Sequence, residues 1–104
     1  MKAIIGGLRY DTETAEEVFS WTNGRNRTDL RFRAKTLYRT RNGRYFLHHD
    51  GGPMTDMGRR IDDHTITGSE SIEPISEDAA FRFLCSHGGI RAAERLFPDR
   101  IQDA

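Results

Sequence analysis

The sequence predicts an α+β fold in which an antiparallel sheet of about four or five strands carries two C-terminal helices on one face. Three observations support this prediction. An Asn-Gly pair at residues 42 and 43 separates two β-prone runs, apolar and basic residues alternate just before it, and a capped helical pattern begins at Ser76. We expect residues 1–104 to form a single domain.

The N-terminal region predicts a hairpin followed by a short helical or extended segment. Residues 3–5 and 8–10 flank Gly6-Gly7, a pair typical of a tight turn between strands. Asp11 with the acids that follow it favours one or two helical turns over residues 11–17. Residues 18–21 are β-prone and are equally compatible with a strand.

Residues 30–35 alternate apolar with basic side chains, the period-two pattern of a strand with one buried face. Arg31, Arg33 and Lys35 should then point in the same direction. Leu37 falls on this basic side, so we expect a bulge or short break near residues 36 and 37 that returns it to the core.

The strongest local signal is a hairpin whose strands span residues 36–41 and 44–49. Its Asn42-Gly43 pair predicts a type I′ turn, because both residue types tolerate positive φ. Residues 54–70 lack periodicity and predict a loop or weak strand. Residues 71–75 predict an edge strand, since Pro74 cannot donate a central ladder hydrogen bond.

Two helices should complete the chain. Ser76 is a good N-cap, Ala79, Ala80, Phe83 and Leu84 give a helical apolar stripe, and Gly88-Gly89 should end it. The apolar positions Ile90, Ala93, Leu96 and Phe97 predict a second short helix that Pro98 stops.

Composition indicates a polar domain with a small core: 36% of residues are hydrophobic, 31% are charged, and the mean hydropathy is −0.72. No stretch approaches the roughly 20 apolar residues of a membrane helix, and the first residues are too few for a signal sequence. Cys85 is the only cysteine, which excludes an internal disulfide. We expect a soluble, cytoplasmic protein.

The formal net charge is zero, but the charge is unevenly distributed. Between Arg25 and Arg44, eight basic residues face the single acid Asp29, a local charge of +7, whereas residues 1–24 carry −2 and residues 45–104 carry −5. The protein should therefore have a basic face and an acidic one. Complementary faces and free sheet edges also make a homodimer conceivable.

The basic segment predicts a binding surface. Its arginines can contact phosphates or acidic protein groups in bidentate pairs, and Phe32, Tyr38 and Tyr45 could stack on bases. The simpler alternative is a solvated face neutralised by the protein's own acids. The candidate partner-binding residues are Arg25, Arg27, Arg31, Arg33, Lys35, Tyr38, Arg39, Arg41 and Arg44.

Support for catalysis is weak. Residues 48–50 (His-His-Asp) and 62–64 (Asp-Asp-His) contain metal-ligand types, but neither has a nuclease or zincin spacing, and adjacent histidines on a strand point to opposite faces. A metal-dependent nuclease that uses His48 or His49 with Asp63 and His64 remains an alternative. We expect no enzyme activity and no cofactor.

Nine elements of the sequence together resemble a family of small bacterial proteins carried on plasmids, phages and integrative elements. They are Ile4-Ile5-Gly6, Tyr-Asp-Thr-Glu-Thr-Ala at residues 10–15, Asn23-Gly24, Asp29, Thr-Leu-Tyr-Arg at 36–39, Gly43, Tyr45-Phe46-Leu47, Gly-Gly-Pro-Met at 51–54, and Ile75-Ser76-Glu77. Some members of this family act as anti-CRISPR proteins.

The resemblance implies an inhibitor that binds a CRISPR effector, either its Cas protein or its interface with guide RNA or target DNA, and blocks it. The chain departs from these relatives in its arginine content and in ending with Arg-Ala-Ala-Glu-Arg-Leu-Phe at residues 91–97 rather than with an acidic helix. Since surface charge selects partners, a free-standing regulator that binds DNA or RNA for a mobile element is the second hypothesis.

Overall fold

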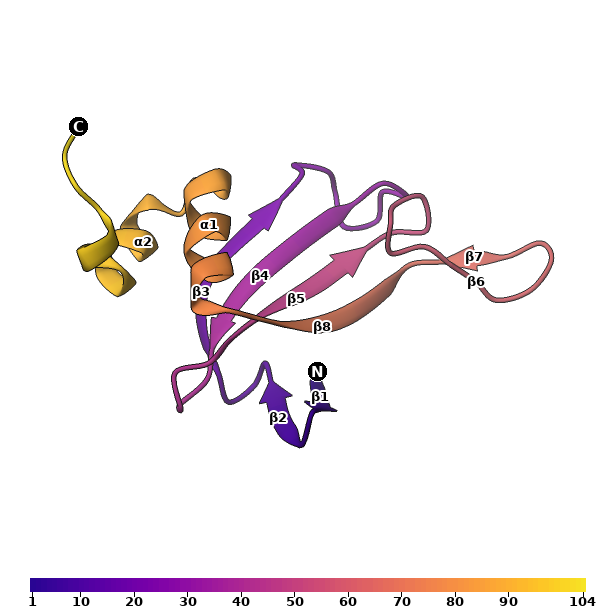
Figure 1. The fold of residues 1–104 in the computed structure, drawn as a ribbon. Helices are drawn as coiled ribbons and strands as arrows, with labels where there is room; N and C mark the ends of the chain where they lie inside the picture. The colour runs from indigo at the N-terminus through magenta and orange to yellow at the C-terminus, as the bar shows by residue number, and fades with distance from the viewer.

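The structure, a computed structural model that describes residues 1–104, confirms the α+β fold (Figure 1). A four-stranded antiparallel sheet has the order β3-β4-β5-β8. Its strands are β3 (Glu16–Thr22), β4 (Arg33–Arg39), β5 (Tyr45–Gly51) and β8 (Ser69–Ile75). Strand β8 lies at an edge, as Pro74 predicts.

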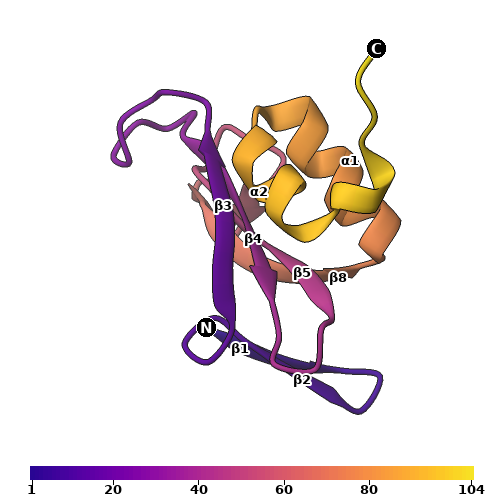
Figure 2. The ribbon, with the colours of Figure 1, turned by 90° about the vertical axis from the view of Figure 1, so that its left-hand side faces the viewer.

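Two helices cover one face of the sheet at one end (Figures 1 and 2). Helix α1 (Glu77–His87) begins at Ser76, whose Oγ accepts a 3.0 Å hydrogen bond from the Ala79 N–H, and it ends at Gly88 with φ +84°. Helix α2 (Ile90–Leu96) follows, and after it comes the 3-10 helix η1 (Pro98–Arg100). Both predicted helices are confirmed. The buried core is formed by Leu37, Tyr45, Leu47, Ala80, Phe83, Leu84, Ala93 and Phe97.

The predicted N-terminal hairpin is also confirmed. Strands β1 (Lys2–Ile5) and β2 (Leu8–Asp11) pair across Gly6 and Gly7, which both have positive φ. The helical turns expected over residues 11–17 do not form. The N–H groups of Thr14 and Ala15 donate to the Asp11 carbonyl and form a single turn. The chain then continues as strand β3, which pairs with β4.

The hairpin of β4 and β5 is confirmed, but its predicted type I′ turn is wrong. Only Gly43 has positive φ, at +83°, and Asn42 does not. Thr40 and Arg44 close the turn through a 2.8 Å backbone hydrogen bond, so the loop has three residues rather than two. A three-residue loop commonly combines an ordinary turn with one left-handed glycine, and this leaves Asn42 unstrained.

The break predicted near residues 36 and 37 is wrong as well. Strand β4 pairs in regular register with β5 from Arg33 opposite Gly51 to Arg39 opposite Tyr45, and the irregularity lies instead in β3 between Glu17 and Phe19. Arg33, Lys35 and Leu37 therefore share one face. The helices cover only the Leu37 end of this face (Figure 1). Its other end carries polar side chains, among them Arg33 and His49.

Within residues 54–70, residues 59–67 extend away from the sheet (Figure 1), whereas residues 69 and 70 already belong to β8. The extended part contains the short strands β6 (Arg59–Arg60) and β7 (Ile66–Thr67), which pair as a small hairpin, in agreement with the predicted loop or weak strand. None of the helices is both long enough and apolar enough to cross a membrane.

Candidate binding surface

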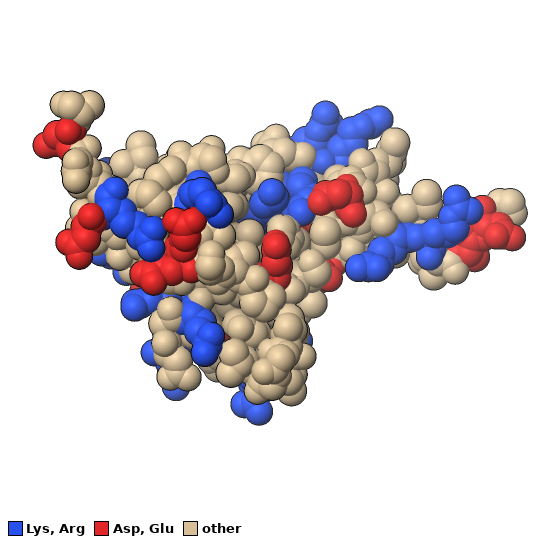
Figure 3. All heavy atoms as spheres, in the orientation of Figure 1, with Lys and Arg blue, Asp and Glu red and all other residues tan.

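The predicted basic residues do not form one face. They divide between the two ends of β4, and Figure 3 shows basic and acidic side chains interspersed on the same side of the molecule. We call residues 23–32, between β3 and β4, the basic loop; it carries Arg25, Arg27 and Arg31. We call Arg39, Arg41 and Arg44, at the turn between β4 and β5, the turn cluster.

The basic loop is held in one shape by Asn23. The Asn23 side-chain amide donates to the Arg31 carbonyl at 2.8 Å, and its Oδ1 accepts the N–H groups of Arg25 and Arg33 at 3.3 Å. Gly24, with φ +80°, bends the chain beside it. The loop therefore presents its arginines from a fixed backbone.

Asp29 stabilises the basic loop and neutralises the charge of one of its arginines. Its Oδ1 accepts the Arg31 N–H at 2.7 Å, and its Oδ2 lies 3.4 Å from Arg25 Nη1. The Arg31 N–H, with the Arg25 charge adding to it, lowers the pKa of the Asp29 carboxyl. Arg25 is thus partly occupied, while the exposed Arg31 side chain has no acidic partner within ion-pair distance.

Arg27 is also occupied within the chain. Its Nη2 lies 2.9 Å from Asp50 Oδ2, and its guanidinium lies 5.6 Å from the ring centroid of Phe32. Phe32 itself is buried. Arg27 therefore links the basic loop to β5 and has less charge available to a partner than Arg31.

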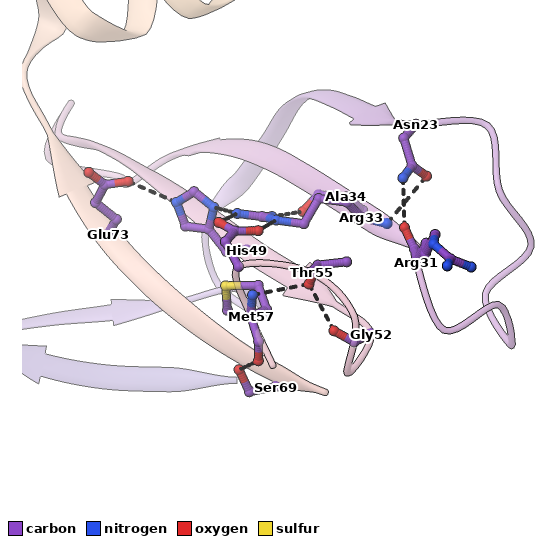
Figure 4. Close-up of polar contacts among 11 residues, drawn as sticks. Asn23, Arg31, Arg33, Ala34, His49, Gly52, Thr55, Met57, Ser69 and Glu73 are labelled. Atoms are coloured by element: carbon purple, nitrogen blue, oxygen red, sulfur yellow. Dashed lines mark hydrogen bonds and ion pairs between the residues drawn. The ribbon is translucent and has the colours of Figure 1, made fainter. Parts of the chain in front are cut away.

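Arg33 is a structural residue rather than a free contact (Figure 4). Only 9% of it is exposed, and its guanidinium forms a two-point ion pair with Asp56 at 2.7 and 3.1 Å. It also donates to the Ala34 carbonyl and, at 2.8 Å, to Nδ1 of His49. His49 in turn reaches Glu73 through Nε2 at 2.8 Å. Because the guanidinium N–H groups of Arg33 already donate to these residues, they are not available to a partner.

The aromatic residues do not provide a platform for base stacking. Phe32 and Tyr45 are buried, and Tyr38 stacks on Phe46 with a centroid distance of 5.1 Å. Burial, followed by the negative charge of Glu17, raises the pKa of the Tyr38 hydroxyl. Lys35 lies over Trp21, with its ammonium 6.0 Å from the ring centroid. This surface suits contacts to charged groups rather than to bases.

The turn cluster is the part of the predicted site that remains free. Arg39, Arg41 and Arg44 are exposed, and none has a carboxylate within ion-pair distance. A Cβ added at Gly43 would lie 3.9 Å from Arg39 Nη2, so the Arg39 side chain runs alongside the turn. Three adjacent guanidinium groups without internal partners are available to an anionic partner.

The structure adds Arg9, which the sequence did not indicate because it lies in the acidic N-terminal segment. The β1–β2 hairpin passes under the end of the sheet (Figure 2). Arg9 of this hairpin lines the same cleft as Arg41 and Arg44 of the turn. Tyr10 fixes this placement, since its buried ring meets Phe46 edge-on at 5.5 Å. Tyr10 and Phe46 lie 36 positions apart, and no local sequence pattern predicts a contact over that separation.

The residues of the nuclease alternative are not brought together. His48 and His49 point to opposite faces, as predicted, and their Nε2 atoms each lie 2.8 Å from a glutamate, Glu70 and Glu73 respectively. Asp63 and His64 lie in the loop between β6 and β7. No three His, Cys, Asp or Glu side chains are grouped so as to hold a metal ion.

No family model, curated protein or solved structure matches the chain.

Proposed function

We propose that this protein is an anti-CRISPR-like inhibitor that binds a CRISPR effector ribonucleoprotein and blocks it by occlusion. The observation that carries the binding surface is that four arginines of the basic segment between residues 25 and 44 are exposed and have no internal acidic partner: Arg31, Arg39, Arg41 and Arg44. The family resemblance supplies the class of partner. The mechanism needs no reacting group, because a bound protein obstructs an effector by its volume alone.

The spacing of these arginines supports a polyanionic partner. Strand β4 separates the basic loop from the turn cluster by six residue steps, which is about 20 Å at the usual strand rise. A nucleic-acid strand or a row of acidic side chains can meet both ends at once. Guanidinium groups favour such partners because they bind phosphate and carboxylate through two parallel hydrogen bonds.

The test is inhibition of target-DNA cleavage by a panel of purified effector ribonucleoproteins. The informative variant replaces Arg31, Arg39, Arg41 and Arg44 by Glu, and it leaves the structural Arg33 in place. We expect wild type to inhibit an effector and this variant to lose inhibition. A charge-matched control replaces Lys2, Arg59, Arg60 and Arg91, which are exposed and lack internal ion pairs, by Glu and should still inhibit. Equal inhibition by the two variants would show that Arg31, Arg39, Arg41 and Arg44 do not form the binding surface.

The same free arginines support the second function, a regulator that binds DNA or RNA directly. Four phosphate contacts predict a slope of about −3 when the logarithm of the affinity for single strands is plotted against that of the salt concentration. Binding of bare nucleic acid with this slope, without inhibition of any effector, would favour the regulator.

A further inference from the structure

A cleft of about 390 Å³ lies between the β1–β2 hairpin and the turn between β4 and β5. Figure 2 shows these two segments next to each other below the sheet. Arg9 and Asp11 line it from the hairpin, and Thr40, Arg41 and Arg44 line it from the turn. The two sides come from segments that are distant in the sequence, so the cleft exists only in the folded protein.

Both walls of the cleft have a fixed backbone. On the hairpin side, the buried Tyr10 ring packs edge-on against Phe46, and this holds the neighbouring Arg9 in place. On the turn side, Thr40 Oγ1 accepts the Arg44 N–H at 3.1 Å, while the Thr40 N–H donates to the Arg44 carbonyl at 2.8 Å. A ligand would meet a preformed site, which lowers the entropic cost of binding.

The cleft has an uncompensated positive charge. Arg9, Arg41 and Arg44 are exposed and have no carboxylate within ion-pair distance. Asp11 is the single acid in the lining, and its Oδ1 already accepts the Glu13 N–H at 3.0 Å. Three guanidinium groups against one carboxylate leave a formal charge of +2.

We propose that this cleft binds phosphate groups of nucleotides or of a nucleic-acid strand. Guanidinium groups pair with phosphate oxygens through two hydrogen bonds, and the hydroxyl of Thr40 can donate one more. The cleft offers no free aromatic face to a base, since Tyr10 is buried against Phe46. Recognition therefore rests on the phosphate and not on the base.

This inference rests on the proposed function, because Arg41 and Arg44 belong to the binding surface proposed there. It names phosphate as the ligand of these two residues and adds Arg9 to the site. Arg9 lies outside the four residues replaced in the inhibition test. Its effect on phosphate binding can thus be measured separately from inhibition of an effector.

The experiment titrates wild type and the single variants Arg9→Gln, Arg41→Gln and Arg44→Gln with a labelled single-stranded RNA, with and without a 5′-phosphate, and follows fluorescence anisotropy. Each variant should bind about tenfold more weakly, the loss typical of one charged hydrogen-bonding partner. Arg91→Gln is the control and should bind like wild type. Circular dichroism checks that each variant is folded.

Competition identifies the source of the phosphate. Preference for the 5′-phosphorylated RNA, with displacement by ATP, indicates a terminal phosphate; equal binding of both RNAs indicates the strand backbone. Wild-type affinity of Arg9→Gln, or absence of binding by wild type to RNA, ATP and inorganic phosphate, would overturn the inference. If Arg9→Gln loses RNA but still inhibits an effector, the cleft is dispensable for the proposed function. If it loses RNA in a protein that inhibits nothing, the cleft stands without that function.

Discussion

Arg33 Nε lies 2.7 Å from Oδ1 of Asp56, and this ion pair joins strand β4 to the segment that follows β5. The guanidinium is largely buried, whereas the carboxylate is mostly exposed. A residue that the sequence placed in the partner-binding face thus holds the fold together. Replacing Arg33 should therefore lower the stability of the fold rather than remove a contact with a partner.

Replacing Arg33 by Ala should lower the free energy of unfolding by about 2 kcal/mol, because it removes several hydrogen bonds from one charged group. The midpoint of urea unfolding measures the loss. Arg31→Ala is the matched control and should stay within about 0.5 kcal/mol of wild type, since its side chain is exposed. Equal stability of the two variants would contradict the structural role of Arg33.

His49 should carry a ring proton on Nε2 and accept a hydrogen bond at Nδ1. An arginine guanidinium has no acceptor, so His49 Nδ1 must accept the 2.8 Å hydrogen bond from Arg33, and Nε2–H then donates to Glu73. Long-range ¹H–¹⁵N correlation spectra distinguish the two tautomers at neutral pH. A proton observed on Nδ1 would show that the contact with Arg33 does not form in solution.

The protein should lose stability in acid partly through Asp29 and Asp56. Hydrogen bonds from the Arg31 backbone and the Arg33 side chain, respectively, lower the pKa of each carboxyl below its ordinary value of 3.8. The folded state therefore binds fewer protons than the unfolded state. The stabilisation is fully present above pH 3.8 and is lost as the pH falls through the lower folded-state pKa.

Melting temperatures measured from pH 7 to pH 2 check this expectation. Asp29→Asn and Asp56→Asn should each be less stable than wild type at neutral pH, and the difference should shrink as the pH falls below 4. A constant difference across this range would show that the two carboxylates do not contribute through their charge.

The turn between β4 and β5 gives a test of its geometry. Gly43→Ala should cost about 1 kcal/mol, because alanine disfavours the φ of +83° at this position. Asn42→Ala should be nearly neutral, since Asn42 does not have positive φ. Thermal unfolding of both variants is sufficient. Equal losses would point to a type I′ turn, in which both residues have positive φ.

Local patterns predicted much of the fold. The Asn42-Gly43 signal identified the β4–β5 hairpin, Pro74 identified an edge strand, and Ser76 marked the start of α1. These features depend on neighbouring residues, so a sequence displays them directly. The facing of β4 was not predictable in this way, because Arg33 and Leu37 share a face that the helices cover at one end only.

The candidate site was predictable only in part. The sequence indicates where arginines are concentrated, but an ion pair such as Arg33 with Asp56, which lie 23 positions apart, decides which of them are free. The same holds for Arg9, which reaches the turn cluster through the packing of Tyr10 on Phe46. Tertiary contacts of this kind leave no periodic signal in the sequence.

The proposed function requires that the free arginines bind a CRISPR effector. The most direct measurement is a pull-down of the tagged protein from lysates that express a panel of effectors, with and without nuclease treatment. We expect capture of an effector by wild type and loss of capture when Arg31, Arg39, Arg41 and Arg44 are replaced by Glu. Capture of no effector, or undiminished capture by that variant, would contradict it.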